Sequence, residues 1–166
     1  MTVNPKIEKL NDPEELRNGV LSIIKENSPV SDTEILRQIK EQIEVVDFKI
    51  LAYPEIEKLR AKRNELEPDS EEAKQLNKRT EKFKLNAKHY SVLTIEQLLK
   101  IAKENSLGLC KNQDFIYLFN RYYWLIINKD TFQVFLGEVA EKMGVDNISA
   151  KHYQFREHLY KQFLTA

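Results

Sequence analysis

The side chains best suited to binding a charged ligand are basic and lie in the middle of the chain. Residues 58–90 hold 10 Lys and Arg against 6 Asp and Glu, whereas residues 1–57 hold 7 against 12. The basic residues that we predict to contact the phosphates of DNA are Lys58, Arg60, Lys62, Arg63, Lys74, Lys78, Arg79 and Lys82. Such contacts do not depend on base sequence, and they weaken steeply as salt is added. The alternative is a solvated helix surface without a ligand. The interspersed acidic residues favour this alternative, because they weaken the positive electrostatic potential.

A group of aromatic side chains forms the second candidate site. The rings are those of Tyr117, Phe119, Tyr122, Tyr123 and Trp124. Rings of this kind stack on unpaired bases in proteins that bind single-stranded nucleic acid. The alternate residues Ile116 and Leu118 are also apolar, so a strand here would have two hydrophobic faces. Because that pattern is typical of a buried sheet, it favours burial in the core or against a partner over base stacking.

A stripe on the last predicted helix is the third candidate, as a surface for a protein partner. It consists of Tyr153, Arg156 and Tyr160, which are three or four residues apart and therefore share one side of a helix. Tyr and Arg are frequent anchors of protein interfaces. Tyr rings also lie half-buried at helix edges with only their polar tips in water, so a structural role for this stripe stays open.

No arrangement of residues in the sequence predicts catalysis. A phosphate-binding loop needs glycines before a Lys-Ser or Lys-Thr pair, and none of the four glycines is so placed. His152 and His158 are six residues apart, so on a helix they point to different sides and make a poor metal pair. We therefore predict no catalytic residue, no metal ligand, no cofactor and no small-molecule substrate.

The composition is typical of a globular chain in a reducing compartment. Of its 166 residues 42% are hydrophobic and 31% are charged, and 26 basic side chains balance 26 acidic ones. This neutral total excludes a uniformly basic DNA-binding protein. The single Cys110 excludes a disulfide framework. Since no apolar run is long enough to cross a bilayer and the first residues lack a secretion-signal pattern, we expect a cytoplasmic protein without membrane contact.

Helix start signals divide the first two thirds of the chain. They are Asp12-Pro13-Glu14-Glu15, Ser31-Asp32-Thr33-Glu34, Asp69-Ser70-Glu71-Glu72 and Thr94-Ile95-Glu96-Gln97. Apolar residues between Leu36 and Tyr53 recur at alternating spacings of three and four, as in the seam of a coiled coil. We predict a long antiparallel helix pair, at about 32–53 and 69–90, within a helical bundle over residues 1–105.

The pattern changes after Asn105, where a strand pattern replaces the helical one. A breaker and a polar loop are predicted over residues 106–114. Two aromatic and β-branched runs then flank Asn120-Arg121, which is the strongest hairpin signal in the chain. We predict one small antiparallel β-hairpin at about 115–127.

The end of the chain returns to a helical pattern. Asn128 is placed to begin a helix that Gly144 ends, and Ser149 is placed to begin the last helix. The predicted fold is therefore mainly α, with the hairpin packed on the C-terminal helices. Residues 106–166 form a hairpin-plus-two-helices module beside the helical region 1–105.

The last third of the chain also resembles a known family. The resemblance is carried by Phe115-Ile116-Tyr117-Leu118-Phe119-Asn120, Tyr123-Trp124, Phe135-Leu136-Gly137-Glu138, Ala140-Glu141-Lys142-Met143-Gly144-Val145 and Tyr160-Lys161-Gln162-Phe163. These residues are similar to the helicase-associated N-terminal domain of phage, plasmid and poxvirus primase–helicases. In that family a short strand, turn and Trp-containing strand precede two helices. The resemblance covers about residues 106–164 and does not extend over residues 1–105.

The resemblance implies a role in the replication of a mobile genetic element. The family's domain lies just upstream of a superfamily 3 helicase ATPase, often behind a primase module. The implied function is a non-catalytic, helicase-associated module that contributes to DNA engagement and assembly, with DNA and either the helicase ATPase domain or further copies of itself as partners. The alternative is a small phage or mobile-element interaction protein, an adaptor or inhibitor, whose seam from Leu36 to Tyr53 binds another helix without any DNA.

Overall fold

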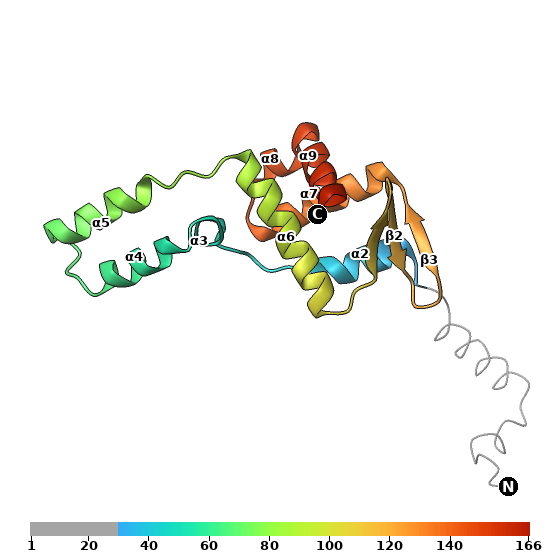
Figure 1. Cartoon of the computed structure of the whole chain (residues 1–166), viewed down its shortest axis with the longest axis horizontal. Helices are drawn as coiled ribbons and strands as arrows, with labels where there is room; N and C mark the ends of the chain where they lie inside the picture. The colour runs from blue at the N-terminus through green and yellow to red at the C-terminus, as the bar shows by residue number, and fades with distance from the viewer. Residues whose placement is uncertain (1–29) are drawn as a thin grey trace, which may run out of the picture.

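The computed structural model describes residues 30–166, which are mainly helical with one small antiparallel sheet (Figure 1). The helices are α2 (Asp32–Glu41), α3 (Phe48–Ala52), α4 (Glu55–Asn64), α5 (Glu71–Glu81), α6 (Ala87–Glu104), α7 (Lys129–Met143), α8 (Asn147–Lys151) and α9 (Tyr153–Thr165). The strands are β1 (Leu109–Asn112), β2 (Phe115–Phe119) and β3 (Trp124–Ile127). This architecture confirms the predicted fold class. The helix predicted to begin at Asp12 lies outside the described residues.

Short polar side chains begin three of the helices where the sequence predicts a start. The hydroxyls of Ser31 and Ser70 and the side-chain oxygen of Asn128 each accept a hydrogen bond from a backbone N–H in the first turn. These bonds satisfy amides that the helix itself leaves unpaired. Gly144 ends α7 with a left-handed φ of 111°, also as predicted.

The predicted long helix at 32–53 is wrong, because the segment is divided into α2 and α3. The linker between them contains Val45 and Val46, β-branched residues of low helix propensity. The N–H of Val46 donates to the carbonyl of Met143 at 3.0 Å, which fastens the linker to the end of α7. The carboxylate of Asp47 then begins α3 by accepting hydrogen bonds from its first backbone N–H groups.

The predicted long helix at 69–90 is also wrong, because α5 ends at Glu81 and a new helix begins after Asn86. The side-chain oxygen of Asn86 accepts from the N–H of His89 at 3.1 Å, and the N–H of Asn86 donates to Nδ1 of His89 at 3.3 Å. This reciprocal cap starts α6 before the predicted start at Thr94, which is buried inside the helix. The antiparallel pair that does form is α4 with α5.

Helices α4 and α5 form a hairpin, here called the basic arm (residues 54–84), which projects from the rest of the molecule (Figure 1). Its helices meet through a narrow apolar contact, in which Ile56 and Ala73 are fully buried. Beside its base, the hydroxyl of Tyr53 lies 3.2 Å from Nε2 of His89. The arm is therefore fixed at its base but has only a thin core along its length.

The sheet is a meander in the order β1-β2-β3, with antiparallel neighbours. Strands β2 and β3 are the predicted hairpin, with Ile116 opposite Ile127 and Phe119 opposite Trp124. Strand β1 lies in the segment predicted to be a breaker and polar loop, so that prediction is wrong there. Gly108 permits the extra strand, because a Cβ at this position would lie 2.3 Å from the Cβ of Phe119. The close approach lets β1 pair along the free edge of β2.

One hydrophobic core joins the early helices to the last third of the chain. Phe132 of α7 is fully buried, with its ring edge-on to Phe163 of α9 at 4.9 Å between centroids. Ile116 and Leu118 of the sheet belong to the same cluster, as does Ile39 of α2. The hairpin thus packs on the C-terminal helices as predicted, and the expected division after residue 105 does not separate two cores.

The last predicted helix is divided in two and begins earlier than Ser149. Asp146 caps α8 by accepting hydrogen bonds from the N–H groups of Ile148 and Ser149 at 3.0 and 3.1 Å. Hydrogen bonds from the side chain and backbone of Ser149 hold the pKa of Asp146 below its usual range. His152 then adopts an extended conformation, which separates α8 from α9.

Candidate nucleic-acid interface

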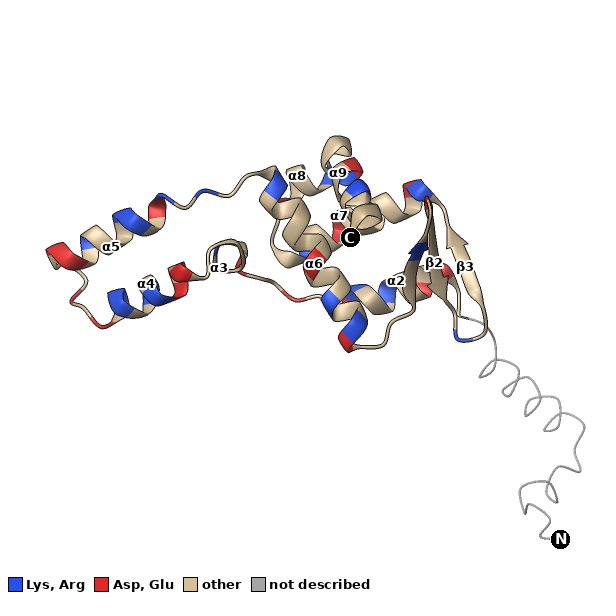
Figure 2. Ribbon diagram, viewed as in Figure 1, with Lys and Arg blue, Asp and Glu red and all other residues tan. Residues whose placement is uncertain are grey.

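The predicted basic residues all lie on the basic arm (Figure 2). Lys58, Arg60, Lys62 and Arg63 belong to α4; Lys74, Lys78 and Arg79 belong to α5; and Lys82 is the C-cap residue of α5. Acidic residues gather around the turn between the two helices, as the red segments of Figure 2 show. The structure therefore brings the two halves of the predicted basic patch together on one projecting hairpin.

Two of these cations are engaged by carboxylates. Arg60 pairs with Asp47 at 2.5 Å, and this hydrogen bond holds the pKa of Asp47 below its usual range. Lys74 pairs with Glu71 at 3.1 Å, but both side chains are more than half exposed, so the pair contributes little. Within residues 30–166, no ion pair involves the other predicted cations of the arm. Most of the arm's cations therefore lack an ion-pair partner, while residues 54–84 as a whole hold 9 Lys and Arg against 8 Asp and Glu.

Three lysines form a line along the exposed side of α5, here called the lysine stripe. Lys74, Lys78 and Lys82 follow one another at every fourth position, about 6 Å apart along the helix axis. All three are exposed, whereas Ala73, on the other side of the helix, is fully buried. A line of this kind can follow the phosphates of a nucleic-acid strand without reading its bases.

A shallow cavity of about 430 Å³ lies near the turn of the arm. Its lining mixes charges, with Lys62 and Arg79 beside Glu65 and Glu72. Because the opposite charges compensate one another, the cavity does not select an anion. The outer surface of the arm, rather than this cavity, is the candidate for phosphate contact.

The sheet has an aromatic outer surface, which corrects the expectation that these rings are buried in the core and leaves burial against a partner as a prediction. Of its inward side chains, Ile116, Leu118 and Ile127 are buried. Its outward side chains, here called the aromatic face, are Cys110, Asn112, Phe115, Tyr117, Phe119, Trp124 and Ile126. Phe115 is 52% exposed and Trp124 is 49% exposed. An antiparallel sheet can be covered on one side only, and this sheet is of that kind in the described part of the chain.

Two members of this surface are absent from the sequence-based prediction. Arg121 occupies the β2–β3 turn with φ 78°, and its side chain is exposed. Phe115 lies at the end of β2 that is farther from this turn. The signal that points to Arg121 is its place between two aromatic runs, where a turn must expose it.

The three residues of the predicted partner stripe do not form one surface. Tyr160 is 7% exposed, and its hydroxyl donates to the carbonyl of Asp114 at 3.2 Å. Nε of Arg156 donates to the carbonyl of Ala150 at 3.2 Å, which ties α9 to α8. Tyr153 is 72% exposed. The geometry gives Tyr160 and Arg156 structural contacts and leaves Tyr153 as the accessible member.

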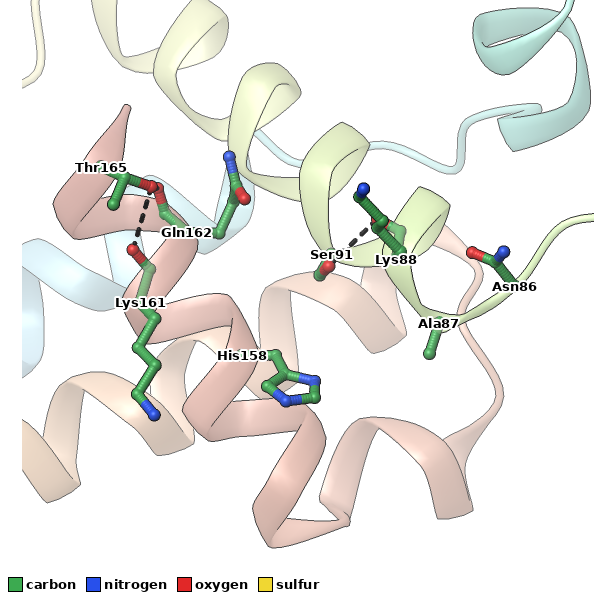
Figure 3. Close-up of a pocket in the computed structure, with 8 residues that line it drawn as sticks. All are labelled: Asn86, Ala87, Lys88, Ser91, His158, Lys161, Gln162 and Thr165. Carbon is green, nitrogen blue, oxygen red and sulfur yellow. Dashed lines mark hydrogen bonds between the residues drawn. The ribbon is translucent and has the colours of Figure 1, made fainter.

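An open pocket of about 550 Å³ lies between the start of α6 and the side of α9 (Figure 3). Lys88, His158 and Lys161 are among its lining residues. The hydroxyls of Ser91 and Thr165 both donate to backbone carbonyls of their own helices. Neither hydroxyl is paired with a base as nucleophilic catalysis requires, so the pocket offers no catalytic arrangement among the described residues.

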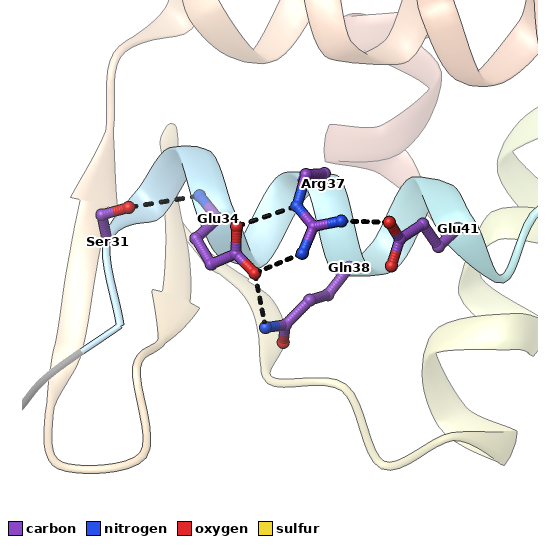
Figure 4. A network of polar contacts seen from close by, with 5 residues as sticks. All are labelled: Ser31, Glu34, Arg37, Gln38 and Glu41. Carbon is purple, nitrogen blue, oxygen red and sulfur yellow. Dashed lines mark hydrogen bonds and ion pairs between the residues drawn. The ribbon is translucent and has the colours of Figure 1, made fainter. Parts of the chain in front are cut away.

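A polar network on α2 contains the most strongly shifted pKa values (Figure 4). Nη2 of Arg37 lies 2.6 Å from Oε1 of Glu34, Gln38 donates to the same carboxylate at 3.0 Å, and Arg37 also pairs with Glu41. The hydrogen bond from Arg37, followed by that from Gln38, lowers the pKa of Glu34 to about 2. These contacts join residues three or four apart on one helix, so they support α2 rather than form a proton-transfer site.

Metal and thiol chemistry find no support in the described part of the chain. Within residues 30–166, no group of three or more His, Cys, Asp or Glu side chains is arranged to hold a metal ion. Burial raises the pKa of the Cys110 thiol, which disfavours its reactive thiolate form. Across the same residues, every helix is too short or too polar to cross a membrane.

Comparison with known protein families, with curated proteins and with solved structures finds no match for this chain.

Proposed function

We propose that this chain is a non-catalytic, helicase-associated module of a phage or plasmid primase–helicase, which engages DNA through the basic arm. The observation that carries the proposal is the lysine stripe of Lys74, Lys78 and Lys82, which is exposed along a projecting helix. The resemblance of residues 106–164 to a helicase-associated domain supports the same function. Neither the stripe nor the resemblance supplies chemistry, so the reaction belongs to a helicase ATPase domain or another partner in the assembly.

The position of the arm supports this function. The arm projects beyond the body (Figure 1), and its lysine stripe is exposed, so a DNA strand can reach it. Its binding groups are cations without shape-specific pockets, so we expect contact with phosphates, little base preference and strong dependence on salt. A neutral chain with such a local patch binds modestly by itself and gains affinity when several copies or a motor domain hold it on the same DNA.

The test is a titration of labelled DNA followed by fluorescence anisotropy at low salt. We expect the triple variant Lys78→Glu, Arg79→Glu, Lys82→Glu to bind at least about tenfold more weakly, since phosphate contacts become repulsions. The matched control reverses three exposed lysines outside the arm, Lys100, Lys103 and Lys151, and therefore changes the net charge equally. Equal affinity of the arm variant and the unchanged chain would exclude the basic arm as the DNA contact.

A second candidate function is an interaction protein that does not bind DNA. Its expected binding surface, the seam from Leu36 to Tyr53, is largely used inside the molecule, because Leu36, Ile39 and Ile43 are buried in the chain's own core. The observation that favours this second function is the exposed aromatic face, which can instead contact a protein partner. A dimer that forms with rising concentration, together with no salt-dependent retention on single-stranded DNA, would favour it over the proposal.

A further inference from the structure

We propose that the aromatic face is a stacking platform for the unpaired bases of single-stranded DNA. The inference rests on the proposed function for the presence of DNA, but it assigns a second surface, separate from the basic arm, and the form of DNA that this surface binds.

The aromatic face and the adjoining turn expose a large area of aromatic side chains. Tyr122 and Tyr123 of the adjoining turn are each 52% exposed, and Ile126 is 61% exposed. An aromatic side chain buries about 200 Å² when fully covered, so the half-exposed side chains of this region together present on the order of 500 Å² of largely apolar surface. That lies near the upper end of what monomeric proteins expose, where large patches usually have a binding role.

The strands and the turn that carry the rings are ordered, and two of the rings contact each other. Phe119 lies opposite Trp124 in the sheet, with 5.2 Å between ring centroids. In the turn, the side-chain oxygen of Asn120 accepts from the N–H groups of Tyr122 at 3.1 Å and Tyr123 at 2.9 Å, and Asn120 is only 1% exposed. A platform ordered before binding loses little conformational entropy when a base stacks on it.

The aromatic face is uncharged, and basic side chains lie at its two ends. The outward strand residues include no charged side chain. Arg121 lies at the turn end, and Lys129 and Lys161 line a pocket of about 580 Å³ at the other end, where Phe115 also contributes. Cations therefore lie at both ends of an uncharged aromatic surface. This arrangement suits a DNA strand, because its bases are flat and its backbone is anionic.

The acidic residues at the pocket end balance the charge of the lysines there, because Asp114 and Glu157 line the pocket with Lys129 and Lys161. Glu157 lies 3.2 Å from Lys129 and 3.6 Å from Lys161, and Asp114 also lines the pocket. One carboxylate is shared by two lysines, and each lysine is at least half exposed. A phosphate can therefore approach either ammonium group from the solvent side.

The dimensions of the face limit the length of the bound segment. Strand β2 has five residues, so the face is about 13 Å long between its ends. Small sheets with aromatic side chains stack about two or three bases, which matches this length. A duplex hides its bases, so the face should discriminate single-stranded from double-stranded DNA.

Trp124 provides a direct test because it is the single Trp of the chain. We expect a short thymidine oligonucleotide to quench its fluorescence, while a blunt duplex of the same length quenches it much less. The double variant Phe115→Leu, Tyr123→Leu keeps apolar side chains but removes two stacking rings. We expect it to weaken single-strand binding about tenfold, with little change in duplex binding through the arm. Circular dichroism checks that both proteins are folded.

The matched control is Tyr153→Leu, which removes an exposed ring from α9 instead of the sheet and should leave single-strand affinity unchanged. Unchanged Trp124 fluorescence at saturating single-stranded DNA would overturn the inference. So would concentration-dependent dimerisation that the double variant abolishes, because the occupant would then be a second copy. If reversal of the arm charges leaves DNA affinity unchanged while Trp124 is still quenched, the proposed function of the basic arm is wrong and the stacking inference is supported. If reversal weakens DNA binding but Trp124 is not quenched, the arm binds DNA and the stacking inference is wrong.

Discussion

The basic arm and the aromatic face present binding groups in contrasting ways. The arm holds long charged side chains on two helices with a thin core, in which Ile56 and Ala73 are the fully buried residues. The aromatic face holds uncharged rings on strands whose other side packs into the main core. Cations act over a distance and tolerate imprecise placement, whereas stacking requires contact. Under the proposed function and the further inference, the arm attracts phosphates and the face takes up bases.

The largest effect is expected in the core beneath the face. Phe132 is fully buried and its ring packs against Phe135 and Phe163. We expect Phe132→Ala to lower the free energy of unfolding by about 4 kcal/mol, because it leaves a cavity among rings that cannot move in to fill it. Urea unfolding followed by circular dichroism measures this loss. A change below about 1 kcal/mol would contradict the packing described here.

A smaller and more local effect is expected in the arm. We expect Ile56→Ala to cost about 2 kcal/mol, the low end for such a truncation, because the arm has few apolar neighbours that could be lost. Hydrogen exchange should show faster exchange in α4 and α5, with α7 and α9 still protected, since the arm opens without the body. Uniformly faster exchange would instead join the arm to the main cooperative unit.

A third variant disturbs the sheet and leaves the arm intact. In Gly108→Ala the new Cβ would lie 2.3 Å from the Cβ of Phe119, so β1 and β2 must move apart. We expect a loss of about 1 to 2 kcal/mol in stability, as in other overpacked sites. Quenching of Trp124 by single-stranded DNA should weaken, while duplex binding stays the same. Equal loss of both kinds of binding would show that the two surfaces are not independent.

The smallest effect is expected in acid, on the polar network of α2. The folded-state pKa of Glu34 is lowered from 4.5 to about 2 by hydrogen bonds from Arg37 and Gln38. Its contribution to stability is therefore fully present above pH 4.5 and is lost as the pH falls toward 2. We expect Glu34→Gln to make the unfolding free energy less dependent on pH in this window. The same pH dependence in both proteins would contradict the assigned cause.

The sequence was sufficient where local chemistry decides the structure. Ser31, Ser70 and Asn128 cap helices through contacts within one turn, and Gly144 has the left-handed conformation that glycine favours. The hairpin of β2 and β3 is similarly local, because its two runs adjoin one turn.

Contacts between distant segments explain most of the errors in the fold. The helix expected at 32–53 is interrupted where Val46 bonds to Met143, far away in the sequence. Strand β1 has a polar sequence and forms because Gly108 lets it approach β2. Helix α6 begins after Asn86 and not at Thr94, because the Asn86 cap includes the side chain of His89. The usual sequence signal for such a cap has Glu or Gln at that position, so His89 is not recognised by it.

For the candidate site, the sequence identified the cations of the arm but not the exposure of the rings. Helical periodicity brings Lys74, Lys78 and Lys82 to one side of α5 whichever element α5 packs against. The aromatic residues of β2 and β3 alternate with aliphatic ones, so both faces look apolar and the pattern cannot show which face the helices cover. That choice depends on α7 and α9 packing against the side that carries Ile116 and Leu118.

The claim that the arm contacts phosphates is tested most directly by the salt dependence of DNA binding. Each lost phosphate contact reduces the slope of log K against log salt by about 0.7 for single strands, so the variant Lys78→Glu, Arg79→Glu, Lys82→Glu should have a slope shallower by about two. The control with Lys100, Lys103 and Lys151 reversed should keep the original slope. Identical slopes for the unchanged chain and the arm variant would contradict the account.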